Sequence, residues 1–268
     1  IETYHSYPKN KQQQLQLAFS QFRLMMSGSM ALPQTTLQKW KEISGHHLLE
    51  RYGMSEILMG VSNLYHAKRI PGAVGWALPS VIICVKQQAA KDYDDEDKND
   101  SDDKSDNNST EDNDNKNSSN DGAVVGELLV RGPTVFHDYY NRPEQTAESF
   151  VTVNDENNNS IKWFCTGDIA KITPDGCVRL LGRNSVDILK VGGTKLSALT
   201  IERQLLDCPM ISSVAVVGLP SASRGQSVAA IVVPDREGEE QYGEKLSVAS
   251  LVKWARERMT YFPRELDI

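Results

Sequence analysis

The sequence predicts two structural units in series, an α/β portion with a mixed sheet over residues 1–185 and a small α+β domain over residues 187–268. Three observations lead to this fold class. Near the N-terminus a strand, helix, strand order is typical of an α/β layer. Two apolar runs, 81–85 and 126–131, predict further strands of one sheet. From Asp187 onward, short strand patterns alternate with amphipathic helices, which is typical of a compact α+β unit.

The N-terminal layer is predicted from apolar periodicity and from its flanking turn residues. Residues 22–27 form an apolar run that ends at Gly28, which predicts a buried strand followed by a tight turn. A helix should follow, with Pro33 in its first turn and Gly45 at its C-cap. Residues 47–50 predict the next strand. The apolar residues at helical spacing between the two strands are Leu37, Trp40 and Ile43.

Residues 86–122 form an acidic insertion between two predicted strands. Residues 91–121 hold thirteen Asp or Glu against four Lys, a local balance of −9, whereas the whole chain carries −7, so that everything else carries +2. The insertion has too few apolar residues to offset its ordering entropy, and we expect a disordered loop around which the fold stays intact. The acidic balance belongs to this insertion, and no nucleic-acid partner is expected.

The second half of the chain predicts several short elements. Residues 169–172 and 178–181 predict two strands joined by a Pro-Asp-Gly turn. The change of pattern after them places a domain boundary near residues 184–187. Beyond it we expect a helix at 198–207, strands at 213–218 and 227–233, and a helix at 247–259 that is capped by Ser247 and buries Leu251, Val252, Ala255 and Met259.

Composition excludes several classes of protein. No run of about eighteen apolar residues occurs, so no transmembrane segment is expected, and the N-terminus does not have the pattern of a signal peptide. Cys84, Cys165, Cys177 and Cys208 are scattered without a Cys-x-x-Cys pair, which argues against structural zinc. The apolar settings of Cys84, Cys165 and Cys208 favour core thiols over two disulfides. We therefore expect an intracellular protein, cytoplasmic or mitochondrial.

The segment Tyr52-Gly53-Met54-Ser55-Glu56 is the first candidate site, because it follows a predicted parallel strand and such sheets bind ligands beyond the carboxyl ends of their strands. A planar aromatic can stack on a purine there, while a hydroxyl and a carboxylate reach phosphate and Mg²⁺. Taken alone, the pentapeptide favours a polar turn after a strand.

Two further motifs strengthen the site. In Thr166-Gly167-Asp168 a carboxylate can accept hydrogen bonds from two adjacent ribose hydroxyls, although it can also be an ordinary turn. Arg183 can contact ribose or phosphate, or form a surface ion pair. Gly192-Gly193-Thr194-Lys195 invites a phosphate-loop interpretation, but it does not have the Walker spacing.

Together and in this order, these motifs resemble the adenylate-forming acyl-CoA synthetases. The resemblance implies that ATP or AMP, Mg²⁺ and coenzyme A are the cofactors and that a small-molecule carboxylate is the substrate. It assigns Tyr52 to adenine, Ser55 to phosphate and Glu56 to the metal, with Ser55 standing where the family commonly has Thr. It further implies nucleotide contacts for Gly28, Ser29, Gly53, Asp168 and Arg183, and a path for the pantetheine chain past Gly192 and Gly193, whose loop enters the site for the second half-reaction.

With Arg51, the sequence resembles the malonyl-CoA synthetases in particular. A dicarboxylate needs a cation for its distal carboxylate, and a guanidinium can bind one bidentately. The alternative is a structural salt bridge with Glu50 or Glu56. The same motifs also serve medium-chain and aryl-CoA ligases and carrier-protein-loading adenylation domains, so that the acyl substrate stays open.

Two elements of the family pattern have no counterpart in these residues: the Ser/Thr/Gly-rich phosphate loop, expected upstream, and the Gly-Lys lysine, expected near the C-terminus. We therefore interpret the chain as the later part of the AMP-binding large domain, residues 1–185, followed by most of a small mobile domain, residues 187–268. Catalytic residues stay unassigned, and the fragment alone is expected to be inactive. The rival hypothesis is a non-catalytic module that binds AMP or a protein partner.

Overall fold

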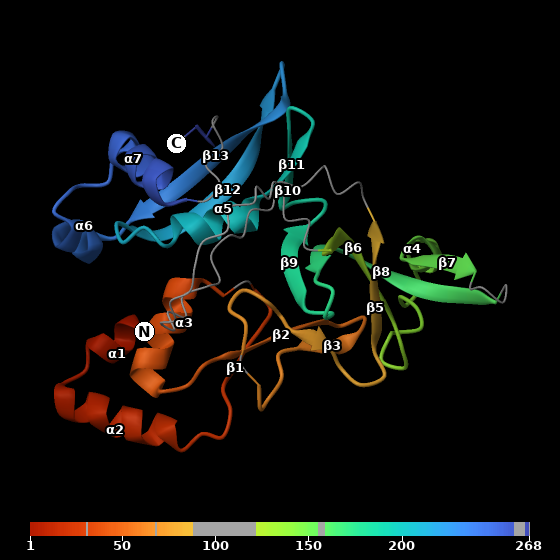
Figure 1. Ribbon diagram of the computed structural model, residues 1–268, viewed down its shortest axis with the longest axis horizontal. Helices are drawn as coiled ribbons and strands as arrows, with labels where there is room; N and C mark the ends of the chain where they lie inside the picture. Colours follow the sequence, from red (N-terminus) through yellow and green to blue (C-terminus); the bar gives the residue numbers. More distant parts are fainter. Residues whose placement is uncertain (31, 68, 88–121, 155–158, 260–265, 268) are drawn as a thin grey trace, which may run out of the picture.

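The computed structural model describes residues 1–30, 32–67, 69–87, 122–154, 159–259 and 266–267. Most of the predicted acidic insertion, residues 88–121, lies outside the described residues. The described strands form three sheets, joined in series along the chain (Figure 1). None of the helices in the described ranges has the length and apolar character that crossing a bilayer requires.

The first sheet has the order β1-β2-β3-β4, with β1 Met26–Ser27, β2 Leu49–Met54, β3 Leu58–Ser62 and β4 Trp76–Ala77. β1 and β2 are parallel and the other pairs antiparallel. Helix α3, Gln34–Ser44, connects the parallel pair and ends at Gly45, whose φ of 74° is left-handed, as predicted for a C-cap. Helices α1, Glu2–His5, and α2, Lys9–Ser20, precede this unit.

Two details of the N-terminal prediction are wrong. The buried strand expected over residues 22–27 is only two residues long, and Phe22 and Met26 are more than half exposed. The second strand runs on through Tyr52 to Met54, so that the tyrosine lies inside the strand rather than after it. Antiparallel pairing with β3 extends β2 in this way, and such a partner is not visible in the local pattern.

The second sheet has the order β5-β6-β8-β7, and β9 pairs with β8. Its strands are β5 Ile82–Gln87, β6 Val124–Arg131, β7 Phe150–Asn154, β8 Ser160–Ile172 and β9 Val178–Arg183, with helix α4, Pro143–Glu148, before β7. The predicted pairing of the two apolar runs in one sheet is confirmed, because β5 and β6 are antiparallel neighbours. Residues Leu128, Val130 and Phe164 from this sheet pack with Ile57 and Val61 in one apolar core.

The third sheet belongs to the C-terminal unit. It is built from β10 Ile188–Val191, β11 Thr194–Ser197, β12 Ile211–Ser221, β13 Gly225–Pro234 and β14 Leu266–Asp267, with helices α5 Ala198–Leu205, α6 Arg236–Tyr242 and α7 Val248–Arg258. Ser247 caps α7 through a reciprocal pair of hydrogen bonds with Ser250, as its sequence position predicts. Leu251, Ala255 and Met259 are buried as expected, but Trp254 is buried where Val252 was predicted.

These sheets confirm the predicted fold class, a mixed-sheet α/β portion followed by a small α+β domain. The second sheet ends at Arg183 and the third begins at Ile188, with an exposed Val186 between them. Ile188 nevertheless packs against residues of the second sheet, in a small cluster with Val125, Ile169 and Leu181. A domain boundary at this turn stays a prediction.

The cysteines are free thiols. Cys208 lies in the core of the C-terminal unit, as expected, and Cys177 is also buried, whereas Cys84 and Cys165 are only half-buried. Burial raises the pKa of all four thiols, which makes them poor nucleophiles at neutral pH.

Candidate functional site

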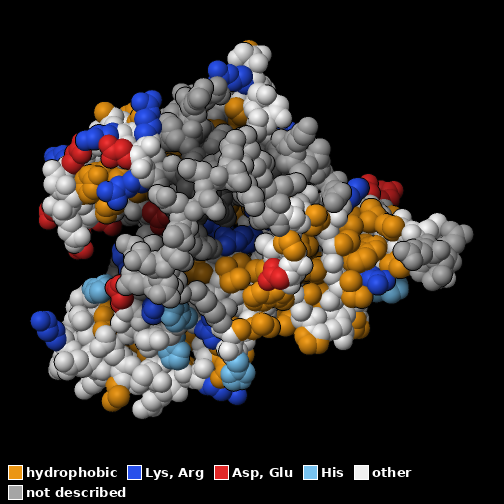
Figure 2. Space-filling view, in the orientation of Figure 1, with side chains coloured by type: hydrophobic (Ala, Val, Ile, Leu, Met, Phe, Trp, Pro, Cys, Tyr) orange, Lys and Arg blue, Asp and Glu red, His pale blue; other side chains and the backbone are white. Residues whose placement is uncertain are grey.

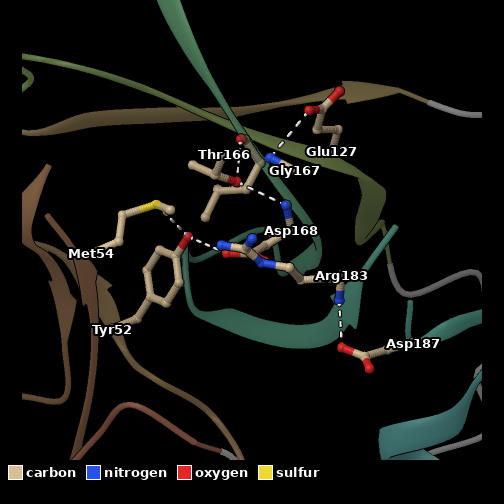
Figure 3. Close-up of polar contacts among 9 residues, drawn as sticks. Tyr52, Met54, Glu127, Thr166, Gly167, Asp168, Arg183 and Asp187 are labelled. Carbon is tan, nitrogen blue, oxygen red and sulfur yellow. Dashed lines mark hydrogen bonds and ion pairs between the residues drawn. The ribbon is translucent and has the colours of Figure 1, made fainter. Parts of the chain in front are cut away.

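Three of the predicted site residues meet around one buried carboxylate, that of Asp168 (Figure 3). The hydroxyl of Tyr52 donates to Asp168 Oδ2 over 2.6 Å, and Arg183 Nε donates to Asp168 Oδ1 over 3.1 Å. Tyr52 comes from β2, whereas Asp168 and Arg183 are register partners on β8 and β9. The structure therefore brings together residues that lie more than a hundred positions apart in the chain.

Asp168 projects from an irregularity in β8. Residues 166–168 interrupt the β6–β8 ladder, since two steps along β6, from Glu127 to Leu129, face four steps along β8. Gly167 adopts a left-handed φ of 74° within this bulge. Bulges of this kind re-aim side chains, and they are frequent beside active sites.

The bulge is held by groups that replace the lost ladder bonds. The buried hydroxyl of Thr166 donates to Leu128 O over 2.9 Å and accepts from Asp168 N over 3.1 Å. Glu127 Oε1 accepts from Gly167 N over 3.2 Å. Sequence reasoning missed Glu127. Its only signal was a carboxylate inside an otherwise apolar strand.

Burial and the neighbouring charge of Asp168 raise the pKa of Tyr52 far above its ordinary value. Tyr52 is therefore a neutral phenol that donates to the carboxylate at physiological pH. Asp168 accepts one hydrogen bond on each oxygen, and a carboxylate offers about four lone-pair sites, so acceptor capacity remains for a ligand. The remaining N–H groups of Arg183 have no partner within the described residues, and its side chain is half exposed.

Ser55 and Glu56 lie in the turn between β2 and β3. The motif was expected to follow a strand end, but its first three residues belong to β2 itself. Gly53 is required here because a Cβ at this position would lie 2.0 Å from Leu58 O. Ser55 is exposed, and Glu56 Oε1 accepts a hydrogen bond from Tyr139 over 2.9 Å.

Glu56 suits a magnesium ion that is shared with a nucleotide. Its second carboxylate oxygen has no protein partner among the described residues. Within the same residues no three His, Cys, Asp or Glu side chains converge as a ready-made metal cage. Mg²⁺ usually takes one or two carboxylates together with substrate phosphates and water, and a single carboxylate fits that pattern.

Arg51 lies beside Gly28. A Cβ on Gly28 would approach Arg51 O to 3.2 Å and Arg51 Cγ to 3.3 Å. Arg51 Nη1 donates to the sulfur of Met59 over 3.0 Å, and the half-buried guanidinium has no carboxylate partner within the described chain. Neither alternative salt bridge is present among the described residues; Glu50 accepts from Gly72 N, and Glu56 accepts from Tyr139.

The other predicted site residues are Gly192, Gly193 and Ser29. Within the described chain they make no hydrogen bond to Tyr52, Asp168 or Arg183. Gly192 and Gly193 form the two-residue turn between β10 and β11, both with positive φ, and open space surrounds both positions. The Gly192 amide donates to Arg224 O within the C-terminal unit. Ser29, with a φ of 71°, forms the turn after β1.

A cavity of about 810 Å³ lies between the N-terminal layer and the C-terminal unit. Residues of α3, β9, α5 and α7 line it, together with the loop that holds Gly72. Figure 2 shows a hollow on the left of the molecule between these parts. Glu50 is buried at its wall, only 7% exposed, and the raised pKa of its carboxyl group results mainly from loss of solvent. Hydrophobic side chains gather farther right on the viewed face.

Comparison with protein families identifies both ends of the chain. Residues 3–100 match the AMP-binding enzyme family, and residues 200–268 match the AMP-binding enzyme C-terminal domain. Tyr52 lies within the first match, whereas Asp168 and Arg183 lie in the segment between the two matches.

Curated relatives and solved structures agree with this result. A mitochondrial malonate–CoA ligase of Bos taurus is 43% identical over 87% of this chain and 36% of its own length. A malonate–CoA ligase of Arabidopsis thaliana is 36% identical over 97% of this chain and 37% of its own length. The crystal structure of ATP-bound MatB from Rhodopseudomonas palustris is 31% identical, covers 91% of this chain and 41% of its own, and superposes with a TM-score of 0.65.

The chain thus spans well under half the length of these relatives. It matches the AMP-binding enzyme model and the AMP-binding enzyme C-terminal domain model one after the other along the chain. This chain belongs to the adenylate-forming AMP-binding enzymes.

Proposed function

We propose that this chain is part of an ATP-dependent acyl-CoA synthetase that activates malonate. The observation that carries the proposal is the environment of Arg51, a half-buried cation without a carboxylate partner among the described residues, next to the tyrosine that contacts Asp168. In this proposal residues 1–185 form the later part of the large domain and residues 187–268 most of the small one. The names of the malonate-activating relatives support the same substrate.

The reaction has two steps. In the first, a carboxylate oxygen of the substrate attacks the α-phosphorus of ATP, pyrophosphate leaves, and an acyl-adenylate forms. In the second, the thiolate of coenzyme A attacks the acyl carbon and AMP leaves. The chain's residues bind and orient the reactants, while the charge on the reacting phosphate needs groups beyond those assigned here.

Asp168 is the proposed ribose acceptor. Its two oxygens are already oriented by Tyr52 and Arg183, and their remaining lone pairs can accept from the 2′- and 3′-hydroxyls. The ring of Tyr52 is proposed to pack against adenine, with Gly28, Ser29 and Gly53 lining the same site. Charge-assisted bonds of this kind are shorter and stronger than neutral ones.

Ser55 and Glu56 are proposed to face the phosphates. Glu56 would hold Mg²⁺, which supplies charge neutralisation at the phosphate oxygens when bound. Ser55 is exposed in the same turn, so its hydroxyl is available to a phosphate oxygen. Gly192 and Gly193 are proposed to let the pantetheine chain pass close to backbone in the second step, since no side chain fills the space around either residue.

We also propose an intracellular location, because the two substrates, ATP and coenzyme A, are intracellular metabolites and the four cysteines are free thiols. The name of the bovine relative places that protein in mitochondria. The more specific form of this proposal is that the protein is located in mitochondria.

The test is substrate selectivity after loss of the guanidinium. In a full-length protein that carries this chain, Arg51→Leu should lower kcat/KM for malonate far more than for propionate, by about 2–5 kcal/mol. The matched control is Arg142→Leu, which removes an exposed arginine outside the site. Equal losses on both substrates would assign Arg51 a structural role and leave the acyl substrate open, whereas an unmodified protein that cannot adenylate any carboxylate would overturn the function itself.

A further inference from the structure

Glu56 is held from a distant segment of the chain. Its carboxylate oxygen Oε1 accepts from the hydroxyl of Tyr139 over 2.9 Å, and its backbone carbonyl accepts from Phe136 N over 2.7 Å. Both donors lie in residues 132–140, the segment that follows β6. Glu56 is therefore held through its backbone and through its side chain by one segment.

That segment is itself firmly anchored. The ring of Phe136 stacks on Phe150 at a centroid distance of 5.5 Å and meets the edge of Phe164 at 5.3 Å. Phe164 is only 2% exposed, so the segment is pinned to the apolar core. Because Phe136 also contacts the ring of Tyr139 at 4.6 Å, the core fixes the position of the phenol.

A second anchor holds the backbone of Tyr139. Its amide donates to Thr146 Oγ1 over 2.9 Å, and the same hydroxyl donates to Arg142 O over 2.8 Å. Thr146 lies in helix α4, so a regular element holds the backbone of Tyr139.

The chemistry of the contact is that of an oriented carboxylate. A phenol is protonated at neutral pH, so the hydroxyl of Tyr139 donates to the Glu56 carboxylate. It occupies Oε1 and leaves Oε2 without a protein partner in the described chain. Metal-binding carboxylates typically have one oxygen held by such an outer partner, which fixes the direction of the other.

We propose that Tyr139 is a positioning residue that orients the Glu56 carboxylate toward a divalent cation shared with the phosphates of the bound nucleotide. This inference rests on the proposed function, in which Glu56 holds the metal. It adds a residue from outside every motif that the sequence singled out.

The test uses the full-length protein that carries this chain, with Mn²⁺ as the probe and ATP present, and follows free Mn²⁺ by electron paramagnetic resonance. Tyr139→Phe should weaken Mn²⁺ binding roughly 10–100-fold, the usual effect of losing an outer-shell partner. Binding of ATP without metal should stay unchanged. The matched control is Tyr140→Phe, which removes the same hydroxyl from the neighbouring tyrosine, 89% exposed.

A second variant covers the case in which Tyr139→Phe unfolds the protein. Thr146→Val removes the hydroxyl that accepts from Tyr139 N but keeps the phenol, so it should weaken Mn²⁺ binding in the same direction and by less. Wild-type Mn²⁺ affinity in a folded Tyr139→Phe, or in Thr146→Val where that variant is needed, would overturn the proposal.

The variant Glu56→Gln tests the metal-binding role of Glu56 separately from the positioning role of Tyr139. If Glu56→Gln weakens Mn²⁺ binding and Tyr139→Phe does not, only the positioning role is wrong. If neither variant changes Mn²⁺ binding, Glu56 is not the metal ligand and both the inference and that part of the proposed function are overturned.

Discussion

The carboxylate of Asp168 carries the negative charge of the group formed with Tyr52 and Arg183, and Asp168 is only 8% exposed. Each of its oxygens is already engaged by a protein donor, so the carboxylate is oriented before any ligand arrives. Preorganisation of this kind reduces the entropy cost of binding. It also means that a ribose must share Asp168 with Tyr52 and Arg183 rather than meet a free carboxylate.

Replacing Asp168 by Asn tests this arrangement at the scale of one residue. The substitution keeps the shape but removes the charge, and hydrogen bonds to charged groups contribute about 1.5–3 kcal/mol. The affinity for AMP, measured by calorimetry, should fall about tenfold or more. The loss should be smaller for an AMP analogue without the 2′- and 3′-hydroxyls. Asp138→Asn, an exposed acid, serves as control, and equal losses for AMP and the analogue would contradict a ribose-binding role.

At the scale of elements, the β5–β6 hairpin shows how the acidic tract is accommodated. Gln87 pairs with Gly126, so the chain leaves β5 and returns to β6 at neighbouring positions of one ladder. Replacing residues 91–121 by a short Gly/Ser link should therefore leave the melting temperature and adenylation nearly unchanged, since closure entropy depends weakly on loop length. A version with the same composition in scrambled order is the control. If the replacement unfolds or inactivates the protein while the scrambled version does not, the tract has a sequence-specific role.

Local sequence patterns predicted the ends of helices better than they predicted which distant segments pair with one another. The ends of α3 and α7 followed from Gly45 and Ser247, because capping depends on neighbouring residues. Long-range pairing was not visible: the extension of β2 by β3, the bulge at residues 166–168 and the bond from Tyr139 to Glu56 all depend on distant segments. The motifs predicted which residues form the candidate site, but only tertiary structure reveals the groups that contact them.

At the scale of the whole molecule, Glu50 lies at the wall of the cavity between the N-terminal layer and the C-terminal unit. Burial raises the pKa of Glu50, although Gly72 N–H, Arg203 and Arg179 each lower it. A carboxyl group whose pKa is raised on folding binds more protons in the folded state, so the stability it contributes is present below its ordinary pKa of 4.5 and is lost as the pH rises through the raised folded-state value.

Glu50→Gln should therefore become more stable relative to wild type as the pH rises from about 4 to 7, because the amide keeps an acceptor for Gly72 N without a buried charge. Melting temperatures across this range measure the trend. Glu42→Gln, an exposed acid that lines the same cavity, should show no such trend. A Glu50→Gln protein that loses stability at neutral pH would mean that the attraction to Arg203 and Arg179 outweighs the cost of burial.

The turn between Arg183 and Ile188 connects the second sheet to the third. Asp187 N and Val186 N both donate to Arg183 O, and Asp187 Oδ2 accepts from Arg183 N, so a few residues fix the direction in which the C-terminal unit begins. Family resemblance implies that the small domain rotates between adenylation and thioester formation, and hinges are short segments that absorb such changes in φ and ψ.

Val186→Pro tests whether this turn is that hinge. Proline fixes φ near −65° and removes the bond from Val186 N to Arg183 O, at a cost of about 1 kcal/mol, while the bond from Asp187 N remains. In the full-length protein, pyrophosphate exchange should therefore be largely retained, whereas transfer of the acyl group to coenzyme A should slow, because the family resemblance implies that only the second step requires the Gly192-Gly193 turn to enter the site. The two half-reactions are measured separately, with Val186→Ala as the control for loss of an exposed side chain. Parallel loss of both half-reactions would indicate general damage, and retention of both would place the hinge elsewhere.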